Sequence, residues 1–353
     1  MENNIREIKN AIFPTKENLI KKAYERLDNL TKPKGSLGRL EEVAAKLFAI
    51  FDGNMPLELK KVIYVFAADH GVTEEGVSAY PKDVTYQMVF NFLGGGAAIN
   101  VFSRVSGAKV YVVDMGVDYN FPEGLELINR KIAKGTKNFA KVAAMSESEA
   151  VNSILAGFDI AKEAIKRGYN LLAPGDMGIG NTTASSAVLK AATGIDTELL
   201  VGFGTGIDER TLTKKITVID KAIALHNPKS DDAIDILKKV GGFEIGAICG
   251  FILGAAYCRK PVVIDGFISA AGFVLASLIN KNVLDYAIFS HCSMEKGHKH
   301  FFDFIKAKPL LDLNLRLGEG TGSALVFPVI EAAVRMFNEM ATFSQANVSE
   351  QLS

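Results

Sequence analysis

One carboxylate lies among glycines in the run Leu315–Gly322 (LRLGEGTG), just before an apolar stretch that predicts a helix. A carboxylate held there beside Leu317 could be desolvated, and desolvation raises the pKa of a carboxyl group toward the value that a general base needs. Glu319 or Thr321 could instead cap the helix, because its amino end favours a negative or hydroxyl group. The spacing alone slightly favours capping.

A second glycine-rich run, Gly175–Thr183 (GDMGIGNTT), separates a predicted strand from a helix that should begin near Thr182. Closely spaced glycines let a phosphate approach backbone N–H groups, and the helix dipole favours the anion. The run matches neither the dinucleotide-binding pattern GxGxxG nor the Walker A loop, which ends in GK[ST]. By itself it is equally compatible with phosphate binding and with a tight left-handed turn.

Histidines occur in three further places. Ser290–His298 (SHCSMEKGH), with His300 nearby, fits no common zinc spacing, so we expect no metal and favour a polar loop that contacts sugar or phosphate. Asp69 and His70 could suggest a catalytic triad, but the chain has no GxSxG nucleophile. His226 is expected to be a loop or helix-end residue.

An aromatic segment could line a pocket for a flat ligand. Its apolar candidates are Tyr80, Tyr86, Met88, Phe90 and Phe92, and Gln87 could supply a hydrogen bond. Aromatic residues at such spacing are more often ordinary core, so the segment is only suggestive.

The elements that would carry these residues alternate between strands and helices. Predicted strands are Lys61–Ala67, Lys109–Val113, Asn170–Ala173, Pro261–Ile264, Asp285–Phe289 and, more weakly, Glu198–Val201. Continuous apolar runs of this kind are typical of parallel strands that are buried on both faces. Helical patterns such as Ser148–Arg167 lie between them, so the sequence predicts an α/β fold.

Glycine, acidic and hydroxyl residues follow most of the predicted strands. Examples are AADHGVTEEG, APGDMGIGNTT and FSHCSMEKGH. The carboxyl ends of parallel strands meet at one edge of a sheet, and ligands bind at that edge. The preference of glycine and aspartate for turns explains any single segment of this kind after a strand. It explains five or six such segments in one chain less well.

Composition excludes several classes of protein. The 353 residues carry 40 Lys and Arg against 40 Asp and Glu, and zero net charge argues against a protein that mainly coats nucleic acid or an anionic membrane. A hydrophobic content of 48% excludes a disordered chain, and three cysteines are too few for a disulfide framework. The start resembles no signal peptide, and no apolar stretch is long enough to span a bilayer. We expect a soluble, cytoplasmic protein.

Both ends of the chain predict helices that should pack together. Thr15–Leu30 has one apolar face, Ser36 could cap a second helix, and Ala324–Phe343 should form a long helix with Pro328 in its first turns. We therefore expect two parts. Residues 59–310 should form a large α/β domain, and residues 1–58 should form a small helical subdomain that residues 311–353 complete.

Nine motifs, in order along the chain, together resemble one family. They are KPKGSLGRLE (32–41), ADHGV (68–72), VSAYPKDVTYQMV (77–89), LGGGAAIN (93–100), GTKNF (135–139), GDMGIGNTT (175–183), GTGIDE (204–209), SHCSMEKGH (290–298) and LRLGEGTG (315–322). The family is nicotinate-nucleotide–dimethylbenzimidazole phosphoribosyltransferase, from the lower-ligand branch of cobalamin synthesis. The resemblance implies a homodimer with a Rossmann-like, mostly parallel sheet of about six strands, flanked by helices and joined to a small helical subdomain from both termini.

The resemblance implies a reaction in which phosphoribose moves from nicotinate mononucleotide to 5,6-dimethylbenzimidazole. The products would be nicotinate and α-ribazole 5′-phosphate, formed with inversion and without a cofactor. Transfer to another base (a purine, another benzimidazole or a phenolic) and a non-catalytic module that binds a nucleotide or phosphosugar are the alternatives. A nicotinamide-dependent oxidoreductase or a phosphohydrolase is disfavoured, because GxGxxG and a metal cluster are missing.

The resemblance also assigns two catalytic residues. Glu319 matches the catalytic glutamate of the family and would be the general base. Asp176 stands where the family commonly carries Glu, and its side chain is one methylene shorter. A displacement of about 1 Å matters in positioning reacting groups, so a secondary acid–base or electrostatic role of Asp176 is an open question.

Binding residues follow from the same motifs. The phosphate would meet the loop residues Met177, Gly178, Gly180, Asn181 and Thr182, together with Lys215, although Lys214 beside it leaves that register open by one. Other nucleotide contacts would be Ser293, Leu317 and Gly318. The base pocket would be lined by Ser78, Tyr80, Gln87 and Met88.

Overall fold

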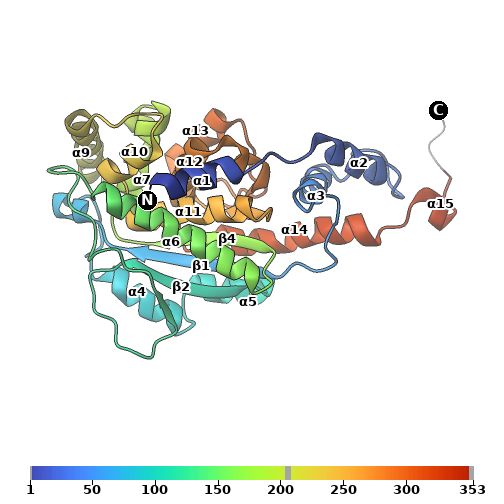
Figure 1. Cartoon of the computed structure of the whole chain (residues 1–353), viewed down its shortest axis with the longest axis horizontal. Helices are drawn as coiled ribbons and strands as arrows, with labels where there is room; N and C mark the ends of the chain where they lie inside the picture. The colour runs from blue at the N-terminus through green and yellow to red at the C-terminus, as the bar shows by residue number, and fades with distance from the viewer. Residues whose placement is uncertain (1, 203–207, 350–353) are drawn as a thin grey trace.

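Six parallel strands form one sheet in the computed structural model, which describes residues 2–202 and 208–349 (Figure 1). The strands are β1 (Lys61–Ala68), β2 (Lys109–Gly116), β3 (Leu127–Asn129), β4 (Leu171–Met177), β5 (Val262–Ile264) and β6 (Ala287–Phe289). Their spatial order is β3-β2-β1-β4-β5-β6, which is the Rossmann order. The predicted α/β fold with a Rossmann-like sheet of about six strands is confirmed.

Helices precede, connect and follow these strands. They are α1 (Glu2–Ala11), α2 (Glu17–Asp28), α3 (Arg39–Ile50), α4 (Val84–Leu93), α5 (Ala98–Ser106), α6 (Glu147–Lys166), α7 (Asn181–Thr193), α8 (Thr197–Leu200), α9 (Glu209–His226), α10 (Ala233–Val240), α11 (Phe243–Tyr257), α12 (Phe267–Ile279), α13 (Lys296–Ile305), α14 (Thr321–Glu339) and α15 (Phe343–Ala346). In residues 2–202 and 208–349, no helix is both long and apolar enough to cross a membrane.

One predicted strand is wrong. Residues Glu198–Val201 lie mostly in α8, a single helical turn whose Leu200 is buried while Leu199 is exposed. A four-residue apolar run has no period that separates a strand from a helix. The sixth strand is instead β3, which has only three residues and pairs with β2 at the edge of the sheet.

Alternate residues of β1 point to two separate cores. Val62, Tyr64 and Phe66 face the core that contains α6, α11 and α12, whereas Ile63 and Val65 face α3, α5 and α14. Figure 1 shows β1 and β2 between α6 and α11 on one side and α4 and α5 on the other. Burial on both faces explains why the strand is apolar along its length.

Helix α11 lies against α6 at an unusually short distance. Gly246, Gly250 and Gly254 form a stripe at four-residue spacing on α11. A Cβ atom on Gly250 would lie 1.7 Å from the carbonyl oxygen of Ile154, and one on Gly157 of α6 would lie 1.9 Å from that of Ala247. Only glycine permits this approach of the two backbones.

Helices from the two ends of the chain pack together. Helix α3 contacts α2 and α14, and Leu30 pairs with Thr342 in an isolated antiparallel bridge. Figure 1 shows α2, α3 and the carboxyl end of α14 at one end of the molecule. Helix α1 behaves differently, because Ile5 and Ile8 join the core around α6 and α11. The domain boundaries at 58/59 and 310/311 stay a prediction.

Two details of these terminal helices differ from expectation. Ser36 does not cap α3, because the helix begins later, with Gly38 at its N-cap. Helix α14 begins at Thr321 rather than Ala324, so Pro328 lies inside the helix and not in its first turns. The start is early because Gly320 adopts φ +90° and turns the chain directly into the helix.

Candidate active site

A cavity of about 330 Å³ opens at the carboxyl ends of the strands, where the strand order reverses between β1 and β4. This position is where Rossmann-like sheets bind ligands. Its lining includes eleven residues predicted for the site: Tyr80, Met88, Asp176, Met177, Gly178, Asn181, Thr182, Ser293, Leu317, Gly318 and Glu319. The structure thus brings together the runs GDMGIGNTT, SHCSMEKGH and LRLGEGTG.

Glu319 is a buried carboxylate on the wall of this cavity. Its backbone has φ +63°, a left-handed conformation that is uncommon outside glycine, and its Oε2 accepts the backbone N–H of Ile99 at 3.1 Å. Ile99 belongs to the first turn of α5, so Glu319 faces the amino end of that helix and does not cap α14. Burial raises the pKa of Glu319, the Ile99 N–H opposes the rise, and Asp265 adds to it.

A backbone contact ties this residue to the second glycine run. A Cβ on Gly175 would lie 2.3 Å from the carbonyl oxygen of Glu319, so the end of β4 and the GEGTG segment are in direct contact. Asp176 follows on β4 and lies beside Gly318. The two candidate catalytic carboxyls therefore occupy neighbouring segments.

Asp176 is buried to the same extent as Glu319. Its Oδ2 accepts the Asn181 amide N–H at 3.0 Å, and its Oδ1 has no hydrogen-bond partner in the described part of the chain. Burial raises the pKa of Asp176 well above the ordinary aspartate value, with Asp265 and Glu244 adding to the effect. Such a carboxyl holds its proton more tightly than an exposed one.

Lys215 supplies a buried positive charge at the start of α7. Its Nζ donates to the Thr182 hydroxyl at 2.9 Å, and burial lowers the pKa of Lys215 to about 8. Thr182 lies in the first turn of α7, after the left-handed Gly180. An ammonium group beside a helix amino end is an arrangement that suits an anion. Of the two adjacent lysines, Lys215 is the one that bonds to Thr182 of the loop. Its contact with the phosphate stays a prediction.

Ser293 is fixed by the rest of its own motif. Its backbone N–H donates to Nδ1 of the fully buried His298 at 2.9 Å, and its hydroxyl donates to the Leu315 carbonyl at 3.1 Å. Burial lowers the pKa of His298 to about 3, so the ring stays neutral. SHCSMEKGH is thus a braced polar loop. Across residues 2–202 and 208–349, no three His, Cys, Asp or Glu side chains are grouped as metal ligands.

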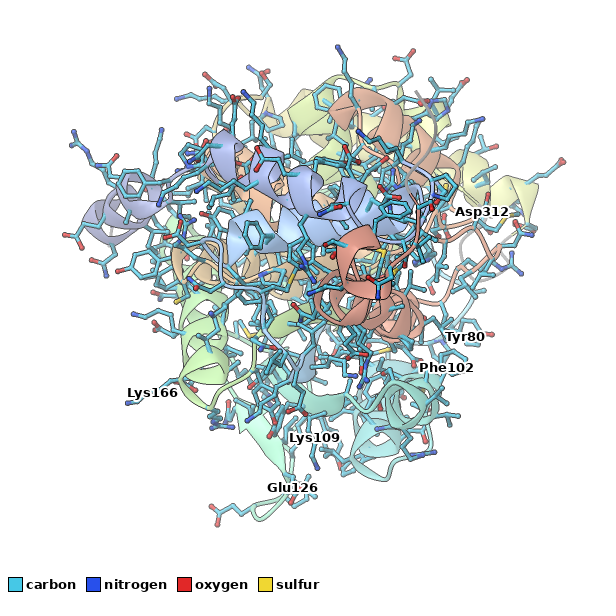
Figure 2. The ribbon with its side chains drawn as sticks, turned by 90° about the vertical axis from the view of Figure 1, so that its right-hand side faces the viewer. Tyr80, Phe102, Lys109, Glu126, Lys166 and Asp312 are labelled. Atoms are coloured by element: carbon cyan, nitrogen blue, oxygen red, sulfur yellow. The ribbon has the colours of Figure 1, made fainter. Side chains whose placement is uncertain are left out.

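The aromatic segment only partly reaches the cavity. Tyr80 and Met88 line it, and Figure 2 shows Tyr80 at the outer edge of the molecule, where half of its surface is exposed. Gln87 is exposed and Ser78 accepts the Tyr80 backbone N–H; neither lines the cavity. Their contacts with substrate stay predictions.

The other aromatic residues of this segment lie elsewhere, which corrects the expected pocket. Tyr86 stacks on Tyr119 with ring centroids 4.4 Å apart, and Phe90 packs edge-on against Tyr119 and Phe121. Phe92 is core. Tyr86 and Phe90 are two residues from Met88 on either side, so the helical period places them on another face of α4. Phe92 is one turn after Met88 and is buried beyond the cavity lining.

Sequence reasoning missed several lining residues. They are Val84, Ile179, Gly266, Phe267, Ile268, His291, Glu295 and Arg316. Most of them follow β5 and β6 or flank a predicted site residue. The segments IDGF and FSHCSMEKGH, which follow those two strands, could have indicated them. His226 ends α9 as expected, and its Nε2 lies 2.7 Å from the Phe139 carbonyl oxygen.

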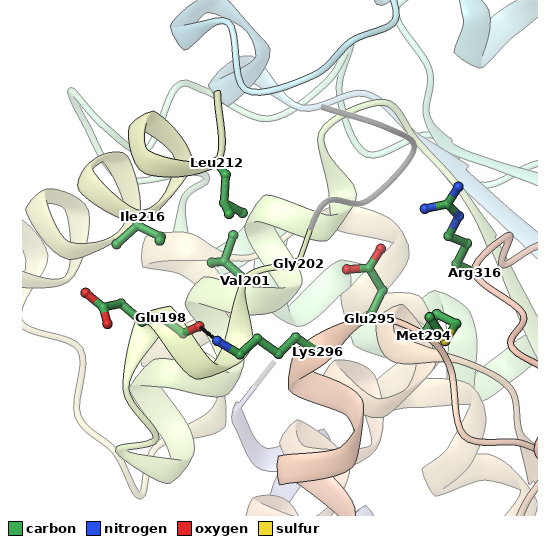
Figure 3. Close-up of a pocket in the computed structure, with 9 residues that line it drawn as sticks. All are labelled: Glu198, Val201, Gly202, Leu212, Ile216, Met294, Glu295, Lys296 and Arg316. Carbon is green, nitrogen blue, oxygen red and sulfur yellow. Dashed lines mark hydrogen bonds between the residues drawn. The ribbon is translucent and has the colours of Figure 1, made fainter. Parts of the chain in front are cut away.

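A second cavity of about 460 Å³ adjoins the first (Figure 3). Glu295 and Arg316 line both, while Leu212, Ile216 and Val201 give the second an apolar side. Lys296 donates to the Glu198 carbonyl at 2.8 Å, so its charge is directed away from the first cavity. Four residues of the GTGIDE motif, 204–207, lie outside the described residues.

The arrangement joins two chemical capacities within one cavity. Glu319 can accept a proton, because its raised pKa brings it closer to neutral pH than an exposed glutamate. The α7 amino end can hold an anion; its Thr182 lines the cavity, and Lys215 does not line it but bonds to Thr182 from behind. A substrate that carries a phosphate and reacts with a weakly acidic N–H group would use both.

Comparison with known proteins identifies a family for the chain. A family model described as phosphoribosyltransferase matches residues 12–348. The nicotinate-nucleotide–dimethylbenzimidazole phosphoribosyltransferases of Geobacter sulfurreducens and Geotalea uraniireducens are 52% and 51% identical to the chain, over 98% and 99% of its length and of theirs. The crystal structure of CobT from Thermus thermophilus superposes with a TM-score of 0.91 at 44% identity, covering 95% of this chain and 100% of that one. The chain belongs to the nicotinate-nucleotide–dimethylbenzimidazole phosphoribosyltransferase family.

Proposed function

We propose that this chain transfers phosphoribose from nicotinate mononucleotide to 5,6-dimethylbenzimidazole, with Glu319 as the general base. The activity is that of its relatives, which match along nearly their whole length. The assignment of the base rests on one observation. Glu319 is a buried carboxylate with a raised pKa on the wall of a cavity that is also lined by the GDMGIGNTT run.

The proposed step breaks one bond and forms another at the anomeric carbon. The C1′–N bond of the nucleotide breaks, and its electron pair passes to the pyridinium nitrogen, so nicotinate leaves without its ring charge and needs no acid. One nitrogen of the benzimidazole bonds to C1′, and the N–H proton of the other nitrogen passes to Glu319. The transition state has oxocarbenium character, as in other glycosyl transfers.

The phosphate of the nucleotide lies against the loop that precedes α7 in this proposal. Gly178 and its neighbours provide backbone N–H groups, the α7 dipole favours the anion, and Lys215 provides the charge. Asp176 has a secondary, electrostatic role. Its Oδ1, which has no partner in the described part of the chain, offers a hydrogen bond to the sugar, and its raised pKa limits negative charge near the phosphate.

Incubation of the protein with both substrates tests the activity through release of nicotinate. Glu319→Gln should lower kcat by about 10²–10⁴-fold, the usual contribution of a general base, and leave the Kd for nicotinate mononucleotide unchanged. Glu339→Gln, at the exposed far end of α14, is the matched control and should behave as wild type. Absence of nicotinate release by the wild type would refute the activity, and near-normal turnover of Glu319→Gln would remove that residue from the role.

A homodimer is the oligomeric state that the family resemblance supports for this chain. Light scattering on the purified protein should then give twice the 38.1 kDa mass of one chain. A mass of one chain at micromolar concentration would contradict it.

A further inference from the structure

The ADHGV motif at the end of β1 has no part in the proposed chemistry. Its histidine nevertheless packs against Gly178 of the run Gly175–Thr183, which is called the phosphate loop below. His70 and Glu244 are both fully buried, and His70 Nε2 lies 2.8 Å from Glu244 Oε1. Glu244 belongs to the first turn of α11, so the pair links the end of β1 to a helix that is distant in sequence. We propose that His70, held by Glu244, is a positioning residue that sets the backbone of the phosphate loop at Gly178.

Two glycines enclose the imidazole ring. A Cβ on Gly178 would lie 3.4 Å from the ring atoms Cδ2 and Nε2 and 2.3 Å from the Ala68 carbonyl oxygen. A Cβ on Gly242 would lie 2.4 Å from the ring atom Cε1. The ring therefore fills the space between the loop at Gly178 and the chain just before α11, and a shift of the ring moves the loop.

The hydrogen bond to Glu244 is what keeps the ring in this orientation. In the described chain, His70 Nδ1 and Glu244 Oε2 have no hydrogen-bond partners, so the 2.8 Å contact is the polar link that joins the two side chains. Because both groups are buried, removing one leaves the other unsatisfied, and the ring loses its fixed position.

The residue after Gly178 is held by a separate contact. The backbone N–H of Ile179 donates to the hydroxyl of Thr85 at 3.1 Å, from the first turn of α4. Gly178 lies between this contact and the His70 ring. Gly178, which is expected to meet the phosphate, is thus supported by two contacts. The His70–Glu244 pair provides the contact that is fully buried.

This inference rests on the proposed function, because it concerns binding of the nucleotide and not of the base. His70 and Glu244 are not among the residues that line the cavity. Their effect should appear in the KM and Kd for nicotinate mononucleotide and spare the KM for dimethylbenzimidazole. A merely structural role would lower stability or the active fraction and leave both KM values unchanged.

Four variants test the pair. His70→Leu and Glu244→Met remove the hydrogen bond at similar side-chain size, and each should raise the KM for nicotinate mononucleotide by about tenfold or more, since misplacement by about 1 Å can cost a hundredfold. Glu244→Gln keeps an acceptor for the ring N–H and should stay within about twofold of wild type. His226→Leu is the matched control, because it removes a histidine contact of 2.7 Å between two residues that do not line the cavity.

The inference is overturned if His70→Leu and Glu244→Met keep the wild-type KM for the nucleotide, or if both substrates are affected alike. If the variants fail to fold, a measurement on the wild-type protein still tests the inference. With five histidines in the chain, ¹⁵N labelling should resolve the protected Nε2–H of His70, and it should shift with nicotinate mononucleotide but not with dimethylbenzimidazole. No shift would also overturn it. If the wild-type protein binds the nucleotide but releases no nicotinate, the transfer reaction is refuted. The role of His70 can then still be tested through the Kd for nicotinate mononucleotide.

Discussion

Lys215 is the buried cation that the proposed anion site depends on, and Lys214 beside it provides an internal comparison. Lys215→Met should raise the KM for nicotinate mononucleotide by about tenfold to a hundredfold, because hydrogen bonds to charged groups contribute about 1.5–3 kcal/mol. Wild-type affinity should also fall as pH rises through about 8, where free Lys215 loses its proton. Steady-state kinetics on both sides of that pH would measure both effects.

The adjacent residue serves as the control for that experiment. Lys214→Met removes the same charge from the same helix but not the bond to Thr182. Its KM for the nucleotide should stay close to the wild-type value. Equal losses in the two variants would mean that the loop responds to general positive charge and not to Lys215.

Residue types and spacing were enough to identify the runs that line the cavity, but not the orientation of single side chains. Glu319 lies between glycines in the sequence, and both capping and base catalysis were compatible with that spacing. The deciding partner, Ile99, is 220 residues away and belongs to another helix, so no local pattern could reveal it. The position of Tyr86 could not be predicted for a similar reason, since its stacking partner Tyr119 follows a different strand.

At the scale of the elements, long apolar strands were predictable and short ones were not. Strand β1 has eight residues that are buried on both faces, and its pattern is unambiguous. Strand β3 has three residues and lies at the edge of the sheet, where pairing with β2 rather than its own composition makes it a strand. Helix α8 shows the converse, because a four-residue apolar run was compatible with either element.

The glycine stripe on α11 leads to a prediction about helix packing. Gly250→Ala should lower the free energy of unfolding by about 1–3 kcal/mol or more, the usual cost of overpacking, because the added methyl would lie 1.7 Å from a carbonyl oxygen of α6. Denaturant titration of the purified variant would measure the change.

The control for this variant is a glycine with open space around it. Gly194 ends α7 at φ +72°, and a Cβ there would contact nothing within 4 Å. Gly194→Ala should therefore cost only the backbone strain of about 1 kcal/mol. Equal costs at positions 194 and 250 would show that α6 and α11 separate easily to admit the methyl group.

At the scale of the whole molecule, the buried carboxyl of Asp176 links folding to pH. Its pKa is raised in the folded protein, so the carboxyl is protonated in both states at low pH and costs nothing there. As pH rises above the ordinary aspartate value of 3.8, the unfolded chain ionises first, and the folded state loses relative stability.

Asp176→Asn should remove this penalty, because an amide oxygen can still accept the Asn181 N–H. The variant should melt at a higher temperature than the wild type at mildly alkaline pH, and the difference should shrink as pH falls toward the ordinary aspartate pKa. Thermal melts at several pH values would measure it, with the exposed Asp312→Asn as the comparison. A difference that does not vary with pH would contradict the raised pKa.

The bridge between Leu30 and Thr342 has a consequence for the newly made chain. Helices α2 and α3 leave the ribosome early, but α14, which covers their apolar side, is synthesised roughly 300 residues later. At about 5–20 residues per second, Leu27 and its neighbours wait roughly 15–60 s for their partner. Glu319 lies just before α14, so translation completes the terminal helical packing and the candidate active site in the same final step.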